Sequence, residues 1–276
     1  MLLSTLPVRR IGVPEDRAPL RFGHADPKSS FSARYLYMSG KPAFELSLWC
    51  GTCPFLFERK EGANGTLSSA VPPLAQLEQD VAEIPEVVLE EFANLIPAGD
   101  YVPLLLEVIP ELVAPNDERD YFSHEQVETW GVDSFWGLPG NPRSFYYRTF
   151  ETAVAADEHL YEFVVPMVPP QWNERGRVEH YVDLMAKGVT PTAVALSTLD
   201  VCQPAMDDAS TDYYAHWGLS HFLLDGHHKM EAAAQVGAKV RLLALVSVQA
   251  SLAGGDDLMR LPEVLSRVPQ ARTAAV

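Results

Sequence analysis

The sequence predicts an α/β protein of the α+β kind, in which a mostly β N-terminal region carrying two or three helices precedes a C-terminal region of alternating strands and helices. Runs rich in Phe, Tyr and Leu, with partial alternation, cover residues 31–58 and are typical of strands. Helical spacing of apolar residues first occurs over residues 73–96, and strand-like and helical runs alternate from residue 144 to residue 248. With 276 residues, 47% of them hydrophobic, the chain can bury a sizeable core.

The first half of the chain is expected to begin with a pair of strands. Residues 34–38 and 44–49 form the two runs, and the Ser-Gly-Lys-Pro stretch at 39–42 is the turn between them. Apolar residues with nearly helical spacing then predict a helix over residues 73–84, and Pro85 begins a second helix that extends to Ile96.

A further strand and a boundary are expected before the second half. Residues 102–113 are apolar and predict a strand interrupted at a proline, and a helix is expected to start near residue 123. The Gly- and Pro-rich stretch 137–142 is a strong loop signal. We therefore predict an N-terminal region over residues 1–140.

The second half begins with strand signals. Residues 145–150 and 160–166 predict two strands joined by a turn at 155–158. A helix is expected over residues 178–187, where Gly188 ends it, and a strand follows over 190–201.

A strand, a turn, a helix and a strand complete this domain. The apolar run 221–224 stops at Asp225-Gly226, an Ala-rich helical run covers 230–236, and the last strand covers 240–248. Residues 253–276 are expected to be a loosely attached tail with a short helix over 261–268. The predicted second domain is therefore residues 141–252.

Charge and hydropathy exclude some classes of partner. The formal net charge is -16, and the longest basic patches are the pairs Arg9-Arg10 and Arg59-Lys60, which disfavours nucleic acid as a partner. No run of about 18 apolar residues occurs, so no membrane partner is expected. The first ten residues contain too short an apolar run for a signal peptide, so a cytoplasmic protein is expected. Nothing in the sequence indicates an oligomeric state.

The most informative motif is Asp225-Gly226-His227-His228-Lys229, at the predicted turn from strand to helix. The start of a helix presents free backbone N–H groups and the positive end of the helix dipole, which suit a phosphate. Gly226 lets the backbone approach such a ligand closely. Asp225 could orient a metal ion or accept a proton from a substrate hydroxyl. In the alternative interpretation, Asp225 only caps the helix and the histidines are solvated.

Residues 160–250 resemble a ParB/sulfiredoxin-like superfamily domain. The order matches: a strand ending at Pro166, a helix, a strand, an insertion, and then a strand followed by the motif, a helix and a last strand. The Gly226-His227-His228-Lys229 stretch is similar to the Gly-x-x-Arg box of that superfamily, with Lys229 in place of the usual arginine. The lysine keeps the charge but loses the bidentate fork of a guanidinium.

The box separates the variants of the superfamily. Sulfiredoxins carry a cysteine in it, so His227 and His228 disfavour reduction of sulfinic acids. Partition-type ParB proteins have a helix-turn-helix domain after the box, for which the tail is too short. The motif is most similar to the Asp-Gly-His-x-Arg box of ParB-like free serine kinases. The resemblance therefore implies a phosphotransferase or nucleotide-binding enzyme that uses ATP or ADP with Mg²⁺ on a small hydroxyl-bearing molecule. In such a reaction Lys229 and one of His227 or His228 are the expected catalytic residues that neutralise the developing charge, and Asp225 serves Mg²⁺ or the substrate hydroxyl. The resemblance also implies a carboxylate base, for which Glu174 and Glu179 are the candidates.

Histidines and an aromatic residue precede the box. Half of the 8 histidines gather in this part of the sequence, namely His216, His221, His227 and His228. Such a cluster is compatible with a metal site or a proton-transfer pair, although His221 is expected to lie within the strand. His216 and Trp217 are candidates for lining the ligand pocket and stacking a base or sugar.

Two cysteines provide another candidate function. The Trp-Cys-Gly-Thr-Cys string that contains Cys50 and Cys53 is similar to the active-site string of thioredoxins, but a strand rather than a helix is expected after it. A zinc site is disfavoured because no second Cys-x-x-Cys pair is present and Cys202 and a histidine would have to complete it. Buried thiols are the simplest interpretation. The alternatives to a phosphotransferase are therefore a non-catalytic nucleotide-sensing or protein-interaction module and, with weaker support, a thiol-redox protein.

Overall fold

The computed structural model describes residues 1–26, 28, 32–47, 51–65, 67, 71–131, 141–204 and 215–269, and within them it has the predicted α/β class. Nine strands form the main sheet: β1 (Leu2–Thr5), β2 (Arg9–Ile11), β7 (Gly99–Val108), β8 (Glu111–Val113), β9 (Tyr146–Ala155), β10 (Glu158–Val165), β11 (Thr192–Cys202), β12 (Ala215–Asp225) and β13 (Val240–Ser247). A second sheet contains β3 (Leu20–His24), β4 (Arg34–Met38), β5 (Lys41–Leu46) and β6 (Phe57–Arg59), in that order.

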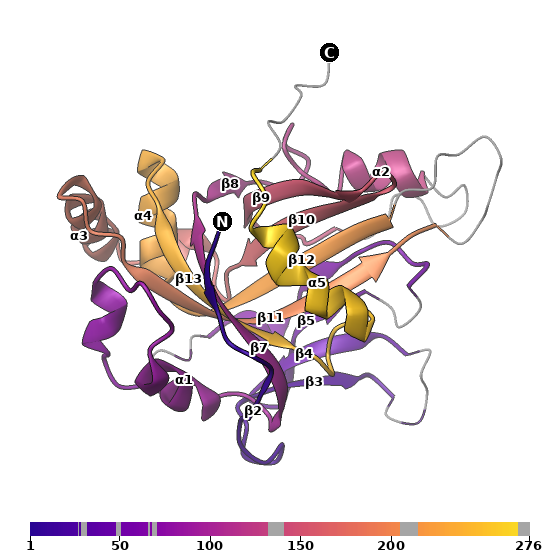
Figure 1. The fold of residues 1–276 in the computed structure, drawn as a ribbon, viewed down its shortest axis with the longest axis horizontal. Helices are drawn as coiled ribbons and strands as arrows, with labels where there is room; N and C mark the ends of the chain where they lie inside the picture. Colours follow the sequence, from indigo (N-terminus) through magenta and orange to yellow (C-terminus); the bar gives the residue numbers. More distant parts are fainter. Residues whose placement is uncertain are drawn as a thin grey trace.

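Helices connect and cover these sheets (Figure 1). The α-helices are α1 (Glu86–Ala93), α2 (Glu125–Trp130), α3 (Arg175–Ala186), α4 (His227–Val236) and α5 (Gly255–Leu265). Three short 3-10 helices are η1 (Glu61–Ala63), η2 (Ala75–Glu78) and η3 (Pro170–Trp172).

The order of strands in the main sheet is β1-β7-β13-β11-β12-β10-β9-β8, and β2 also pairs with β7. Two of its pairs are parallel: β10 with β12, where Val165 lies opposite Phe222, and β11 with β13. The other pairs are antiparallel. The parallel strands β10 and β12 therefore end at the same edge of the sheet, and α3 and α4 follow them there.

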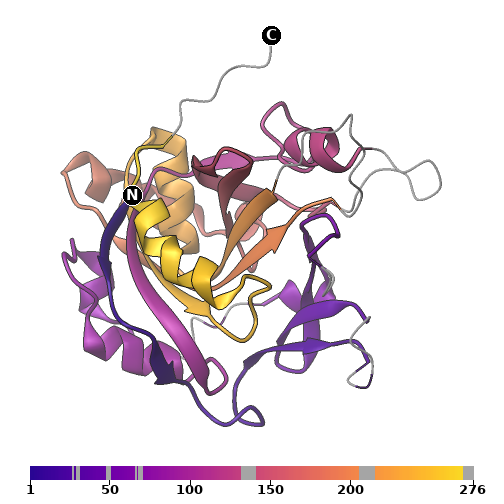
Figure 2. The ribbon, with the colours of Figure 1, turned by 45° about the vertical axis from the view of Figure 1, so that its right-hand side comes forward.

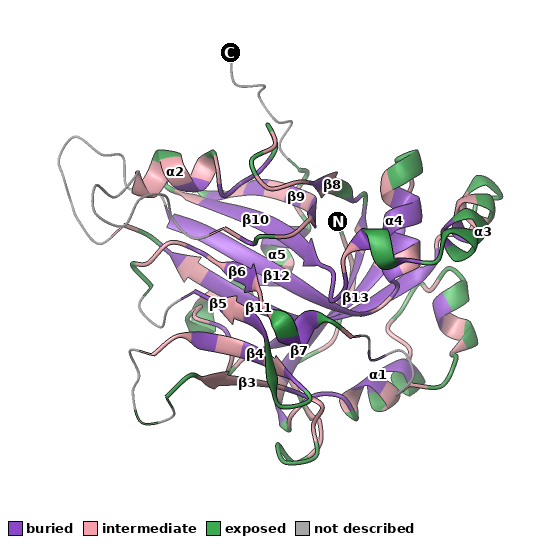
Figure 3. Ribbon diagram, turned by 180° about the vertical axis from the view of Figure 1, so that it is seen from behind, coloured by how far each residue is buried: buried purple, intermediate pink, exposed green. Residues whose placement is uncertain are grey.

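Each face of the main sheet has its own core. The second sheet and α1 cover one face, with Phe44 and Phe92 packed in a cluster that includes Phe222 of β12. Helices α4 and α5 cover the other face, where Met230 and Leu261 belong to the second large cluster; Figure 2 shows α5 in front of the main sheet. Coloured by burial, β10 and β12 are buried along most of their length (Figure 3), as expected of strands covered on both faces.

Several predicted elements are present. The turn between β4 and β5 consists of Ser39 and Gly40, both with positive φ angles of 50° and 81°, which is the geometry that tight hairpins favour. The interrupted strand is β7 followed by β8, and the helix after Pro85 is α1. The predicted end of the first strand pair, residues 48–49, and most of the boundary loop 137–142 lie outside the described residues.

The helix predicted over residues 73–84 is wrong. Only the single turn η2 forms, and Leu77 is its one buried residue. The carboxylates of this segment bind the second half of the chain instead: Tyr181 donates to Glu78, and the backbone N–H of Thr190 donates to Asp80 over 2.5 Å. Residues 73–84 have only a weakly amphipathic helical pattern, and these tertiary contacts override the helix propensity of the segment.

The two predicted regions are joined in one sheet. Strand β7, from the first region, pairs with β13 along eight residues from Val240 to Ser247, so the main sheet crosses the expected boundary at residue 140. The segment expected as a loose tail also differs from the expectation. Helix α5 begins at Gly255, earlier than predicted, and buries Leu258, Leu261 and Val264 against the sheet.

Candidate functional site

The predicted motif lies where β12 ends and α4 begins, at the edge that β10 shares. Gly226 is the residue before the helix and has a φ of +97°, in the left-handed region. A Cβ atom on Gly226 would lie 2.6 Å from the Cβ of Ala193 in β11, so only glycine fits this position. No side chain caps α4, which differs from the interpretation of Asp225 as an N-cap. The first turn of α4 therefore presents its N–H groups without a capping side chain.

Replacing Gly226 tests how closely the turn is packed. Gly226→Ala is expected to lower the free energy of unfolding by about 2–4 kcal/mol, because the left-handed backbone and the contact with Ala193 both act against a Cβ. Gly237→Ala, at the other end of α4, is the matched control: its φ is +65°, but nothing lies within 4 Å of the added carbon. The control should lose only about 1 kcal/mol in urea unfolding. Equal losses in the two variants would show that the contact with Ala193 is unimportant.

Lys229 is the buried centre of the motif. Its side chain is 3% exposed, and its ammonium donates to the backbone oxygen of Thr192 over 3.1 Å. The same nitrogen lies 3.2 Å from a carboxylate oxygen of Asp225 and 3.2 Å from one of Glu78. Two carboxylates therefore surround one ammonium.

Glu78 is a member of the site that sequence reasoning missed. It comes from η2 in the first half of the chain, and the hydroxyl of Tyr181 on α3 lies 3.0 Å from each of its carboxylate oxygens. Burial and the charge of Glu78 raise the pKa of Tyr181, so this hydroxyl remains a donor. No local signal identifies Glu78, because its long-range contacts with Lys229 and Tyr181 are what distinguish it from other exposed glutamates.

The two histidines of the motif are hydrogen-bond acceptors. Nε2 of His227 accepts the backbone N–H of Met167 over 3.1 Å, and burial lowers the pKa of His227 to about 4. Nε2 of His228 accepts the backbone N–H of Glu174 over 3.2 Å, and burial followed by the charge of Arg177 lowers its pKa. Both rings are therefore neutral at pH 7 and hold the segment between β10 and α3 against α4.

A second set of contacts fixes the same segment. Arg175 forms a fork with Glu231 of α4, with N–O distances of 2.6 and 2.9 Å, and the amide of Asn173 donates to Glu231 over 2.7 Å. Burial raises the pKa of Glu231, but the hydrogen bonds from Arg175 and Asn173 lower it more, so its pKa lies below the usual value. These three residues were not singled out in the sequence. The two candidate bases influence different residues. The charge of Glu174 favours a higher pKa of His228, whereas the charge of Glu179 favours a higher pKa of Arg175.

His216 and Trp217 lie at the opposite end of β12. Asp225 comes nine positions after His216, which is about 30 Å along a strand. Trp217 is completely buried, so it is closed to a ligand. The hydroxyl of Tyr121 lies 2.7 Å from Nδ1 of His216, and that of Thr129 lies 2.9 Å from Nε2. Burial lowers the pKa of His216 to about 3. The structure therefore does not bring this pair to the motif.

His221 belongs to a chain of buried polar groups across the main sheet. Oγ of Ser197 lies 2.7 Å from its Nδ1, Nε2 lies 3.1 Å from Glu162, and the hydroxyl of Thr149 lies 2.5 Å from the other oxygen of Glu162. The order serine, histidine, carboxylate is that of a hydrolase triad. However, Ser197 and His221 are completely buried, so no substrate reaches the hydroxyl and the chain is structural.

The structure describes two of the three cysteines, and these two differ in oxidation state. Cys50 lies outside the described residues, Cys53 is disulfide-bonded, and Cys202 is a buried free thiol whose pKa is raised by burial. The interpretation of Cys53 as a buried thiol is therefore wrong, whereas a redox function for Cys50 and Cys53 stays a prediction.

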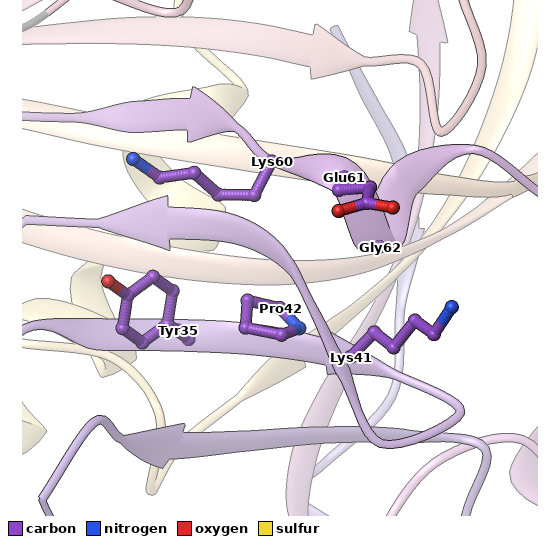
Figure 4. A pocket seen from close by; sticks show the side chains of 6 residues that line it. All are labelled: Tyr35, Lys41, Pro42, Lys60, Glu61 and Gly62. Carbon is purple, nitrogen blue, oxygen red and sulfur yellow. The ribbon is translucent and has the colours of Figure 1, made fainter.

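A cleft of about 470 Å³ lies on the second sheet (Figure 4). Its walls come from β4, β5 and η1, and Figure 4 shows Lys60 and Tyr35 extending toward the same side. The ammonium of Lys60 is 2.6 Å from Glu45 and 3.1 Å from Glu58, so its charge is already balanced. The cleft shares no residue with the motif.

The chain matches no family model, no curated protein and no solved structure. Within the described residues, no group of three or more His, Cys, Asp or Glu side chains is placed to hold a metal ion. The same part of the chain contains no helix that is long and apolar enough to cross a membrane.

Proposed function

We propose that the chain binds a nucleotide with Mg²⁺ at the first turn of α4 and transfers a phosphoryl group to a small hydroxyl-bearing molecule. The observation that carries this proposal is the uncapped start of α4 at Gly226, beside the ends of the parallel strands β10 and β12. Ligands of α/β sheets bind at this kind of edge, and phosphates favour helix N-termini. The elements β10, α3, β11, β12, α4 and β13 also follow the order that the resemblance to the ParB/sulfiredoxin superfamily implies.

The charge balance of the site favours a magnesium complex over a bare phosphate. Asp225 and Glu78 together carry two negative charges against the single ammonium of Lys229. Proteins commonly hold Mg²⁺ through one or two carboxylates and the phosphates of the substrate. Asp225, which is partly exposed, and Glu78 would hold the ion, and the backbone N–H groups of α4 would bind the phosphates.

The remaining residues of the motif have supporting roles in this proposal. Lys229 fixes Asp225 and Glu78 in place, and His227 positions the segment that precedes α3. Glu174 is exposed and its backbone N–H donates to His228, so it is the better candidate to accept the proton of the attacking hydroxyl. Glu179 is related to Arg175 rather than to a residue of the motif.

Nucleotide binding is tested by thermal unfolding with ATP, ADP and CTP, each with and without Mg²⁺. A nucleotide at about a hundred times its dissociation constant is expected to raise the melting temperature by about 5–10 °C, only with Mg²⁺. Asp225→Asn and Glu78→Gln should abolish the rise, because they remove the ligands of the ion. Asp183→Asn, on the exposed side of α3, is the control and should keep it.

Two outcomes separate the functions that remain. The absence of any shift in the wild-type protein would contradict nucleotide binding altogether. A magnesium-dependent shift without transfer of phosphate to serine or related hydroxyl compounds would favour a nucleotide-sensing module over an enzyme.

A further inference from the structure

Trp172 is a large exposed aromatic side chain next to the proposed site. Its relative exposure is 59%, whereas Trp217 is 0% exposed. It ends η3, the single turn that connects β10 to α3. An indole exposed to this extent loses the apolar burial that tryptophan normally gains, which makes a partner for its ring favourable.

The backbone around Trp172 is held firmly. The N–H of Trp172 donates to the backbone oxygen of Pro169 over 2.9 Å, and the N–H of Asn173 donates to that of Pro170 over 3.0 Å. The side chain of Asn173 donates to the backbone oxygen of His227 and to Glu231. The indole is thus one residue away from a group that contacts the first turn of α4.

A cation lies beside the indole. The guanidinium carbon of Arg59, in β6, is 6.0 Å from the centre of the Trp172 ring. Arg59 is fixed there by hydrogen bonds to the backbone oxygen of Ala63 over 2.7 Å and to the side chain of Asn64 over 2.8 Å. An indole flanked by a fixed guanidinium is the type of surface on which nucleobases stack.

We propose that the indole of Trp172 stacks on the base of a purine nucleotide whose phosphates lie at the first turn of α4. This inference rests on the proposed function, because it takes the phosphate site from it. In a nucleotide the base is joined to its phosphates through one ribose, and Asn173, the residue after Trp172 in the chain, contacts the backbone oxygen of His227 in the first turn of α4. A purine covers more of an indole than a pyrimidine does, so ATP binds more tightly than CTP.

The test is calorimetric titration of the full chain with Mg²⁺ and one of three ligands: ATP, CTP or inorganic tripolyphosphate. Trp172→Ala is expected to weaken ATP binding about 10- to 100-fold, which is about 1.4–2.8 kcal/mol and lies within the range for one stacked base. Tripolyphosphate has no base, so its affinity should not change. Trp172→Phe should retain most of the ATP affinity, because a phenyl ring still stacks.

Val236→Ala is the matched control, since Val236 is an exposed apolar residue at the far end of α4. It should leave all three affinities unchanged. A change below threefold in ATP affinity for Trp172→Ala, with binding still abolished by Asp225→Asn, would overturn the stacking role and leave the phosphate site intact. Equal affinities of the wild-type chain for ATP and tripolyphosphate would also overturn it. If the wild-type chain binds none of the three ligands, the proposed function itself is wrong, and the stacking role is wrong with it.

Discussion

Lowering the pH from 7 to 4 is expected to destabilise the folded chain by several kcal/mol, because two buried histidines stay neutral in it. Burial lowers the pKa of His227 to about 4 and that of His216 to about 3, both from 6.5. In the unfolded chain each histidine has a pKa near 6.5 and is protonated below that pH. In the folded chain His227 is protonated only near pH 4 and His216 only near pH 3. The stabilisation is therefore complete above pH 6.5 and is lost as the pH falls through the folded-state values. At about 1.4 kcal/mol per pH unit, the His227 share is about 3 kcal/mol.

Urea unfolding at pH 7, 6, 5 and 4 measures this loss. His227→Gln keeps an acceptor for the backbone N–H of Met167 but has no charge to gain, so the variant should lose about 3 kcal/mol less than the wild-type chain between pH 7 and 4. His180→Gln is the control, because His180 is exposed on α3. If wild type and His227→Gln lose the same stability over this range, His227 is not held neutral by burial.

Features that one or two neighbouring residues determine could be predicted from the sequence. The hairpin turn at Ser39-Gly40 and the turn at Gly226 follow from the few backbone conformations that suit them, and both are present. The position of the motif between a strand and a helix was predictable for the same reason. The charge balance within the motif was not predictable, because Glu78 contacts Lys229 only after the first half of the chain has folded against the second.

The length of β12 was not predictable from its apolar run alone. Only residues 221–224 look like a strand in the sequence, but the strand begins at Ala215 and includes His216, Gly218 and Ser220. Gly218 lies under the ring of Phe55, where an added Cβ would be 2.5 Å from a ring carbon. His216 and His221 are satisfied by partners on other elements. Buried polar residues with such partners break the apolar pattern without breaking the strand.

The role of His221 also required the structure, and it leads to the prediction with the largest effect on stability. Glu162→Leu is expected to lower the free energy of unfolding at pH 7 by about 3–5 kcal/mol, because it leaves the buried imidazole without its carboxylate. Burial raises the pKa of Glu162, but the hydrogen bond and charge of His221 outweigh it, so the pKa is lowered and the carboxylate is ionised. The hydroxyl of Thr149 loses its carboxylate partner in the same variant. Urea unfolding at pH 7 measures the loss.

A double-mutant cycle separates the pair from the burial of either group alone. Glu162→Gln keeps the shape and can exchange hydrogen bonds with a re-oriented tautomer of His221, so it should lose less than Glu162→Leu, about 1–3 kcal/mol. His221→Leu in the Glu162→Leu background should recover part of the loss, since two apolar side chains replace a completely buried polar pair instead of leaving one member without its partner. Strictly additive losses in the cycle would contradict a direct interaction between Glu162 and His221. The chain through Ser197 would then be a set of independent buried groups rather than one coupled network.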